Sequence, residues 1–170
     1  MMRRPLDGIP ADWIGRAYDW HGAGLYRYAL MLLGDTASAA DAVQQVFVAL
    51  VGRGRGSANI DDERRYLRRA VRNECFSALR RRRREIAVVA DSRPLVEAVD
   101  RASVDPELRA AVDEALRTLP SEQREVVHLK VFEGMTFQEI ANLSGESINT
   151  VASRYRYAMD KLRAQLQVPK

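Results

Sequence analysis

Apolar residues recur along most of the chain at intervals of three and four, which gathers side chains on one face of an α-helix. The two-residue alternation of strands is almost absent. In the N-terminal half this pattern predicts one helix that ends before Gly34, a second that includes residues 39–50 and a third over about 61–85. The second helix is expected to bury Ala39, Ala42, Val43, Val46, Phe47 and Leu50.

The periodicity weakens over about 87–104, where a proline-containing stretch interrupts any helix. Beyond it, Pro106 suits the first turn of a fourth helix that ends near 119–120. Three more helices are predicted near 121–133, 136–144 and 147–166. We therefore expect an all-α fold with two small helical domains, at 1–86 and 105–170, joined by a flexible linker at 87–104.

The composition is typical of a globular protein, with 46% apolar and 29% charged residues in a chain of 170. A net charge of +4 and a pI of about 9.5 favour an anionic partner, either nucleic acid or an anionic membrane surface. The charge is uneven, because residues 61–85 hold ten arginines against five acidic residues. The third predicted helix is therefore the most basic part of the chain.

Several kinds of site are excluded by what the sequence lacks. The single cysteine, Cys75, excludes an intrachain disulfide, and with His21 and His128 it offers too few ligands for a zinc site. Without a Gly-rich phosphate loop or a recognisable nucleophile–base pair, we expect no enzyme, cofactor or metal. Because no signal peptide and no apolar run of about 18 residues is present, we expect a cytoplasmic protein without membrane insertion.

The segment Thr136–Tyr155 has the pattern of a helix-turn-helix. Counted from Phe137, Ala141 takes the fifth position, where two helices cross closely, and Gly145 takes the ninth, where the turn needs a positive φ. Val151, at the fifteenth, packs the second helix on the first. The pattern predicts DNA binding. The alternative is an ordinary helical hairpin with a solvated polar face.

A helical wheel separates the faces of the last helix. Tyr155 and Ala158 fall on the core side, and Tyr155 takes over the packing that an apolar residue usually provides at the position of Arg154. On the opposite face, Asn, Ser and Arg side chains suit base edges in the major groove, and the flank suits phosphates. The candidate DNA contacts here are Asn149, Thr150, Ser153, Arg154, Arg156 and Tyr157.

The third predicted helix has a polar face opposite Leu67, where Asn73 and Phe76 lie among arginines. An aromatic ring beside guanidinium groups suits stacking on unpaired bases. A membrane-binding helix would need a free apolar face, and this helix uses its own for the core. The alternatives are a solvated arginine surface and burial of Phe76 against a neighbour. The candidate contacts are Arg65, Arg69, Arg72, Asn73, Phe76, Arg80, Arg81 and Arg82.

At about 22–86 and 105–168 the layout resembles the extracytoplasmic-function sigma factors, the smallest group of the sigma-70 family. The motifs similar to their region 2 are Leu25–Ala29, Asp41–Phe47 and Tyr66–Asn73. Those similar to region 4 are Leu119–Pro120, Gln138–Ala141, Thr150–Val151 and Ser153–Arg154. The order and spacing of these motifs together make the resemblance specific.

The resemblance implies a sigma factor that directs promoter recognition, promoter melting and transcription initiation. Region 2 of the family melts and reads the −10 element, with a base-binding loop that would lie at about 53–61 and a base-reading asparagine that matches Asn73. Region 4 reads the −35 element, here from Ser147 onward. The implied partners are promoter DNA, core RNA polymerase through its β′ clamp helices and β flap, and an anti-sigma factor.

The helix that carries Asp41, Gln44 and Gln45 matches the family's docking surface for the β′ clamp helices. The helical wheel also places an apolar residue, Val48, on this exposed face, as suits a protein interface. The family often has acidic residues where this chain has Ala40 and Gln45. The polymerase-binding candidates are therefore Asp41, Gln44, Gln45 and Val48, on a surface that departs from the family pattern.

Two other functions remain open on the sequence. One is a helix-turn-helix transcriptional regulator that acts without being a polymerase subunit and binds duplex DNA by itself. The other is an interaction module that never contacts DNA.

Overall fold

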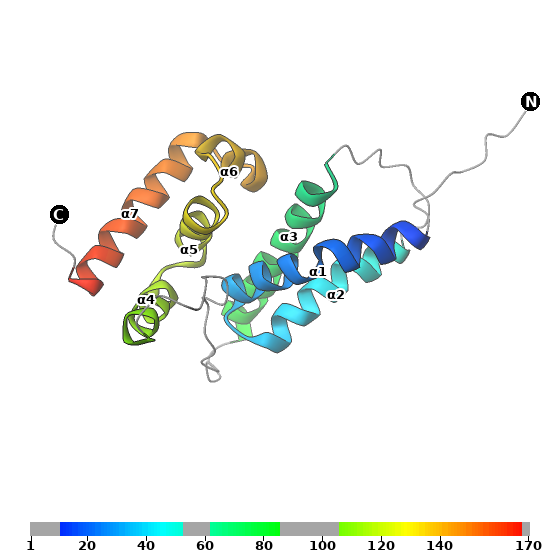
Figure 1. Ribbon diagram of the computed structural model, residues 1–170, viewed down its shortest axis with the longest axis horizontal. Helices are drawn as coiled ribbons and strands as arrows, with labels where there is room; N and C mark the ends of the chain where they lie inside the picture. Colours follow the sequence, from blue (N-terminus) through cyan, green and yellow to red (C-terminus); the bar gives the residue numbers. More distant parts are fainter. Residues whose placement is uncertain (1–10, 53–61, 86–105, 168–170) are drawn as a thin grey trace, which may run out of the picture. The chain divides into compact units, whose positions relative to one another are not determined.

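The computed structural model describes residues 11–52, 62–85 and 106–167, which form helices and short turns without a strand among them (Figure 1). The predicted all-α fold class is confirmed. The expected basic loop at 53–61 and the linker at 87–104 lie outside the described residues. In chain order the elements are α1 (Ala11–Leu33), α2 (Thr36–Gly52), α3 (Glu63–Glu85), α4 (Pro106–Thr118), α5 (Ser121–Val127), η1 (His128–Phe132), α6 (Phe137–Ser144) and α7 (Ile148–Leu166).

The chain forms two compact units. The first comprises Met1–Ala29 with Thr36–Val88, and the second comprises Leu30–Asp35 with Val89–Lys170. Helices α2 and α3 and most of α1 thus belong to the first unit, and α4 to α7 belong to the second.

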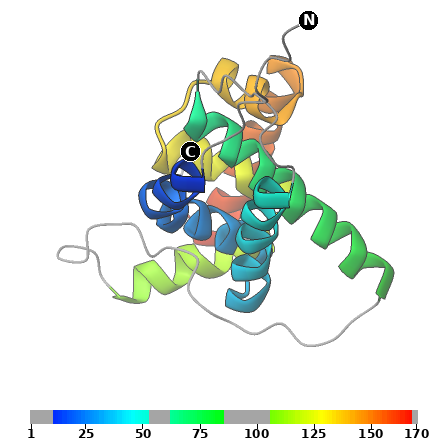
Figure 2. The same cartoon turned by 90° about the vertical axis from the view of Figure 1, so that its right-hand side faces the viewer.

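The first unit buries the faces that the apolar spacing predicts. All the residues expected on the buried face of α2 are buried, and α3 packs against α2, which it crosses in Figure 2. Helix α3 contributes Leu67, Val71 and Cys75, and α1 contributes Leu25 and Tyr28. The core therefore uses the apolar stripe of α3 and leaves its arginine-rich faces for other contacts.

The N-terminal segment extends the first helix and is tied to the start of α3. Trp13 Nε1 donates a hydrogen bond to Glu63 Oε2 at 2.9 Å, and His21 Nε2 lies 3.1 Å from Glu63 Oε1. Helix α3 also has its own cap, because Asp62 Oδ1 accepts a hydrogen bond from the backbone N–H of Arg65 at 2.9 Å. One carboxylate thus joins two turns of α1 to the first turn of α3.

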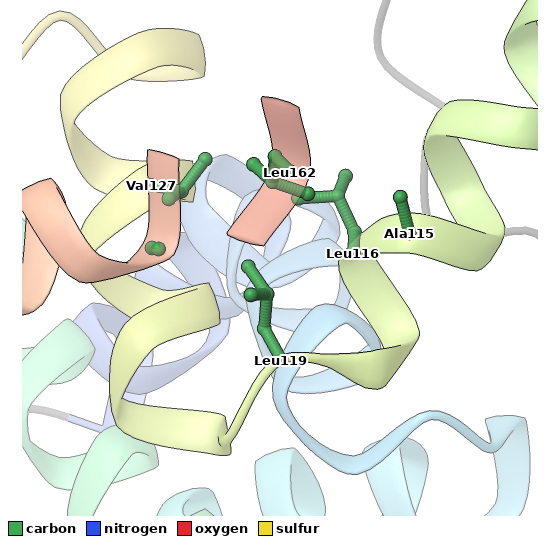
Figure 3. Close-up of a cluster of buried hydrophobic side chains, with 6 residues drawn as sticks. Ala115, Leu116, Leu119, Val127 and Leu162 are labelled. Atoms are coloured by element: carbon green, nitrogen blue, oxygen red, sulfur yellow. The ribbon is translucent and has the colours of Figure 1, made fainter. Parts of the chain in front are cut away.

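The second unit packs α4, α5 and α6 against α7. In its core, Leu116, Leu119, Val127 and Leu162 point toward one another from α4, the α4–α5 link, α5 and α7 (Figure 3). The helix predicted over 121–133 divides in two, since an α-helical part is followed by the π-helical turn η1. The other helices predicted in this half match those of the structure to within a residue or two.

Candidate nucleic-acid and polymerase interfaces

Helices α6 and α7 form a helix-turn-helix through the residues that predict it. Gly145 ends α6 with a φ of 75°, in the left-handed region that favours glycine, and its N–H donates to the Ala141 carbonyl at 2.9 Å. Ala141 and Val151 are buried where the two helices cross. Tyr155 packs against the core cluster, and its ring centroid lies 5.5 Å from that of Phe137. Tyr155 thus supplies the expected packing.

Side chains cap both helices of this motif. The Oγ1 of Thr136 accepts from the N–H of Glu139 at 3.2 Å, and Glu139 Oε2 accepts from the N–H of Thr136 at 2.7 Å. The backbone hydrogen bond, followed by one from the Thr136 hydroxyl, holds the pKa of Glu139 below its usual value. At the start of α7, Ser147 Oγ accepts from the N–H of Thr150 at 3.0 Å. These caps stabilise the starts of both helices and so help to set the direction of α7 relative to α6.

The outer face of α7 presents an amide, a hydroxyl and a guanidinium group, one helical turn after another. Asn149 is exposed, Ser153 is half-buried and Arg156 is exposed. The guanidinium carbon of Arg156 lies 5.1 Å from the centroid of the Tyr157 ring, which is itself exposed. This face can offer hydrogen bonds to base edges, and the Tyr157 ring holds the guanidinium group near the surface.

Arg154 and Thr150, both candidate contacts, are engaged within the protein. Arg154 Nη2 donates to Glu146 Oε1 at 3.1 Å. Thr150 Oγ1 lies 2.8 Å from the capping hydroxyl of Ser147. Glu146 was not among the predicted residues, because it precedes α7 and so lies outside the three- and four-residue spacing that pairs side chains along a helix. The only available signal was an acidic residue next to a capping serine.

On α3, the candidate −10 contacts divide between two neighbouring stripes. A groove of about 620 Å³ between α2 and α3 is lined by Asn73, Arg69 and Arg80, with Tyr66 above them along α3 and Gln45 from α2. The groove brings an amide and two cations together, with an aromatic ring on the same stripe, and the Glu74 side chain also lines it. That set suits a flat polar ligand with a phosphate on either side.

Phe76 lies on the other stripe and is not among the residues that line this groove. Its ring is half-buried, and the guanidinium carbon of Arg72 lies 4.5 Å from the ring centroid. The pair is a cation–π contact between neighbouring turns of α3. Arg72 therefore already covers one region of the ring that the sequence suggested as a stacking platform.

The remaining arginines of this set differ in their surroundings. Arg81 Nη2 lies 3.1 Å from Glu74 Oε1, and both residues line a second, more polar groove together with Asp41 and Gln45 of α2. Arg81 therefore faces the candidate polymerase-binding residues and does not line the groove that holds Asn73. Arg65 and Arg82 are exposed near the two ends of α3, whereas the side chains of Arg83 and Arg84 lie outside the description.

The candidate polymerase-binding residues of α2 are all exposed but line different grooves, and Gln45 also borders the groove that holds Asn73. Asp41 and Gln45 line the polar groove beside α3, whereas Gln44 and Val48 line a larger one, of about 1000 Å³, between α1 and α2. The larger groove is mainly apolar and includes Tyr18, whose ring packs edge-on against a buried phenylalanine of α2. Tyr18 was not among the predicted residues because it precedes the recognisable motifs.

Comparison with known proteins identifies the family. The family models for Sigma-70 region 2 and for Sigma-70, region 4 match residues 17–85 and 109–162. The ECF RNA polymerase sigma factor SigL of Mycobacterium tuberculosis is 34% identical over 160 residues, covering 88% of this chain and 86% of that protein. This chain belongs to the sigma-70 family, as an extracytoplasmic-function sigma factor.

Two further comparisons agree with this identification. The RNA polymerase sigma-E factor of Streptomyces avermitilis is 33% identical over 143 residues, covering 84% of this sigma factor and 79% of that one. The solved structure of the sigma factor RpoE from Bartonella quintana, in complex with the anti-sigma factor NepR, has a TM-score of 0.68 at 23% identity. It covers 92% of this chain and 98% of that chain, and at this identity the likeness concerns the fold.

The protein is therefore an RNA polymerase sigma factor with regions 2 and 4, and proteins of this class bind core RNA polymerase and promoter DNA. Sigma factors are in general non-catalytic initiation factors. A helix-turn-helix regulator that works outside the polymerase is not favoured by the relatives. Within the described residues, no helix is long and apolar enough to cross a membrane.

Proposed function

We propose that this sigma factor carries two DNA readers of unequal kind on one chain. Residues 1–86 engage the −10 element as its strands open, residues 105–170 read the −35 element as duplex, and residues 87–104 link them. Each reader offers few base contacts, each worth about 1–3 kcal/mol. Core polymerase holds the two readers at promoter spacing, so that two weak sites act as one strong site.

The groove between α2 and α3 is the observation that carries the −10 assignment. A base that leaves the stack exposes its hydrogen-bonding edge, and the Asn73 amide can both donate to that edge and accept from it. Arg69 and Arg80 line the same groove and suit the phosphates on either side. Melting then needs no ATP, because unpaired bases are bound better than stacked ones. Arg72, whose guanidinium carbon lies 4.5 Å from the centroid of the Phe76 ring, offers a guanidinium group for a second unpaired base.

The outer face of α7 supports the −35 assignment. Asn149, Ser153 and Arg156 succeed one another along the helix, and their donors and acceptors suit base edges in the major groove. Tyr157 and Thr150 flank that face, Tyr157 beside Arg156 and Thr150 at the capped first turn. We assign the flanking residues to the phosphate backbone.

Polymerase docking is assigned to α2 and its two grooves. Asp41 and Gln45 offer polar contacts on one side, and Gln44 and Val48 border the apolar groove on the other. We propose that the β′ clamp helices bind across the exposed face of α2 between these two grooves. The β flap is assigned to the second unit, where η1 leaves Val131 and Phe132 exposed. Since RpoE is in complex with an anti-sigma factor, we propose a partner of that kind for this chain as well.

The protein is proposed to have no catalytic activity of its own and to work in the cytoplasm with core polymerase. The test is run-off transcription by the reconstituted holoenzyme over a randomised promoter library. We expect two enriched elements, with Asn73→Ala relaxing the choice in the −10 element and Asn149→Ala relaxing it in the −35 element. Arg16→Ala, at an exposed site on α1, is the control.

Two outcomes would contradict the proposal. If the free chain binds specific duplex as tightly as the holoenzyme does, the protein acts as an independent regulator. If neither asparagine variant changes the enriched sequences, the assigned readers are wrong even though the family is right.

A further inference from the structure

The turn of the helix-turn-helix carries a carboxylate that the family assignment does not explain. Glu146 lies between the turn glycine and the N-cap of α7, and its Oε1 accepts a hydrogen bond from Arg154 Nη2 at 3.1 Å. The Glu146 side chain is 38% exposed and the Arg154 side chain is 26% exposed. Ion pairs as exposed as this contribute little to folding stability, so the main effect of the pair is on the charge and orientation of the Arg154 side chain.

The pair lies where α7 would enter the DNA groove. Anions are attracted to the N-terminus of a helix, and phosphates are commonly bound there. A carboxylate at this point repels phosphates. Its negative charge also offsets the positive charge of Arg154, on the flank of α7. An arginine meant to hold a phosphate would gain from having no such neighbour.

The hydrogen-bonding capacity of the guanidinium group leads to a different role. Arginine has five N–H donors in a rigid planar fork, and the contact with Glu146 uses Nη2. The remaining donors can still address a base edge, and a fork held from one side has fewer orientations to lose when it does so. Pairing with Glu146 thus offsets the positive charge of the Arg154 guanidinium group and restricts its orientation.

We propose that Glu146 is a positioning residue that converts Arg154 from a phosphate contact into a reader of one base pair of the −35 element. This inference rests on the proposed assignment of α7 to that element. Binding to any duplex depends mainly on charge, so an offset charge adds little to it. Reading a guanine edge depends on a bidentate fork, so a fixed fork adds to discrimination.

The test measures both quantities with the full chain. In holoenzyme selection over a randomised −35 element, Glu146→Ala and Arg154→Ala should each lower the preference at the same single base pair by about tenfold. For the free chain on non-specific duplex, Glu146→Ala should steepen the dependence of log K on log salt concentration by about 0.9, because Arg154 becomes free to bind a phosphate. The double variant should lose that extra slope.

A matched control separates this effect from net charge. Asp160 lies 3.6 Å from Arg163 on the same helix, and Asp160→Ala removes one carboxylate in the same way. It should leave the base preference unchanged. An unchanged preference at every position in Glu146→Ala, with an unchanged melting temperature, would overturn the inference. So would an equal change of slope in Asp160→Ala. Loss of all −35 selection in the unsubstituted holoenzyme would instead contradict the proposed function.

Discussion

Removal of the Glu63 carboxylate should destabilise the first unit. Glu63 accepts the indole N–H of Trp13 at 2.9 Å and lies 3.1 Å from His21 Nε2, so one side chain joins two turns of α1 to the start of α3. A hydrogen bond to a charged group is worth about 1.5–3 kcal/mol. The Glu63 side chain is 32% exposed, so water can replace part of each contact.

These figures set the expected size of the effect. Because of the exposure, we expect Glu63→Ala to cost about 2 kcal/mol and Trp13→Phe, which keeps most of the ring packing, about 1 kcal/mol. In a domain of 60–100 residues, 1 kcal/mol corresponds to a fall of roughly 4–8 °C in melting temperature. The double variant should lose less than the sum, with a coupling energy of about 1 kcal/mol.

Thermal unfolding of the full chain, followed by far-UV circular dichroism, measures all three variants. Trp20→Phe is the control, because that indole is 85% exposed and should be replaceable without cost. Equal melting temperatures for Trp13→Phe and Trp20→Phe would refute the reasoning. So would strict additivity of the Trp13 and Glu63 substitutions, since it would mean that the two side chains do not interact in solution.

Three further outcomes follow from the structure. Gly145→Ala should cost about 1–2 kcal/mol because of its left-handed φ, whereas Gly15→Ala, in the open on α1, should stabilise by about 0.5–1 kcal/mol, as paired thermal melts will show. Neutralising Arg80 and Arg82 should flatten the salt dependence of single-strand binding by about 0.7 per lost phosphate contact, and an unchanged slope would exclude those contacts. The pKa of Glu139 is lowered in the folded protein, so its carboxylate makes the protein more stable than the Glu139→Gln variant at neutral pH. This difference is lost as the pH falls through that lowered pKa. Parallel acid-unfolding curves for the two proteins would contradict this.

Features that depend on local spacing could be predicted from the sequence. The apolar stripes of α2 and α3, the start of α4 at Pro106 and the helix-turn-helix from Ala141 to Val151 all follow from residues within a few turns of one another. The packing of Tyr155 in place of an apolar residue at position 154 was predictable for the same reason, since a helical wheel needs only the period of the helix.

Contacts between distant residues, and those that depend on a turn, could not be predicted in this way. Trp13 and Glu63 are 50 positions apart, and no periodicity links them. Asn73 and Phe76 are close in sequence, yet only the packing of α2 on α3 shows that the groove includes Asn73 and not Phe76. The pairing of Arg154 with a carboxylate in the turn likewise depends on the direction in which the turn leads into α7.

The two helices proposed to bind DNA differ in how their charge is compensated. Helix α3 holds ten arginines against three acidic residues, one of which, Glu74, pairs with Arg81, whereas on α7 both Arg154 and Arg163 lie beside a carboxylate. Attraction to phosphates that does not depend on sequence grows with uncompensated charge and is weakened by salt. On the proposed assignment, α3 therefore supplies most of the salt-sensitive attraction to DNA. Helix α7 contributes directional hydrogen bonds to bases, which salt affects less. Rising ionic strength should therefore lower the affinity for the −10 element before it lowers the base preference in the −35 element.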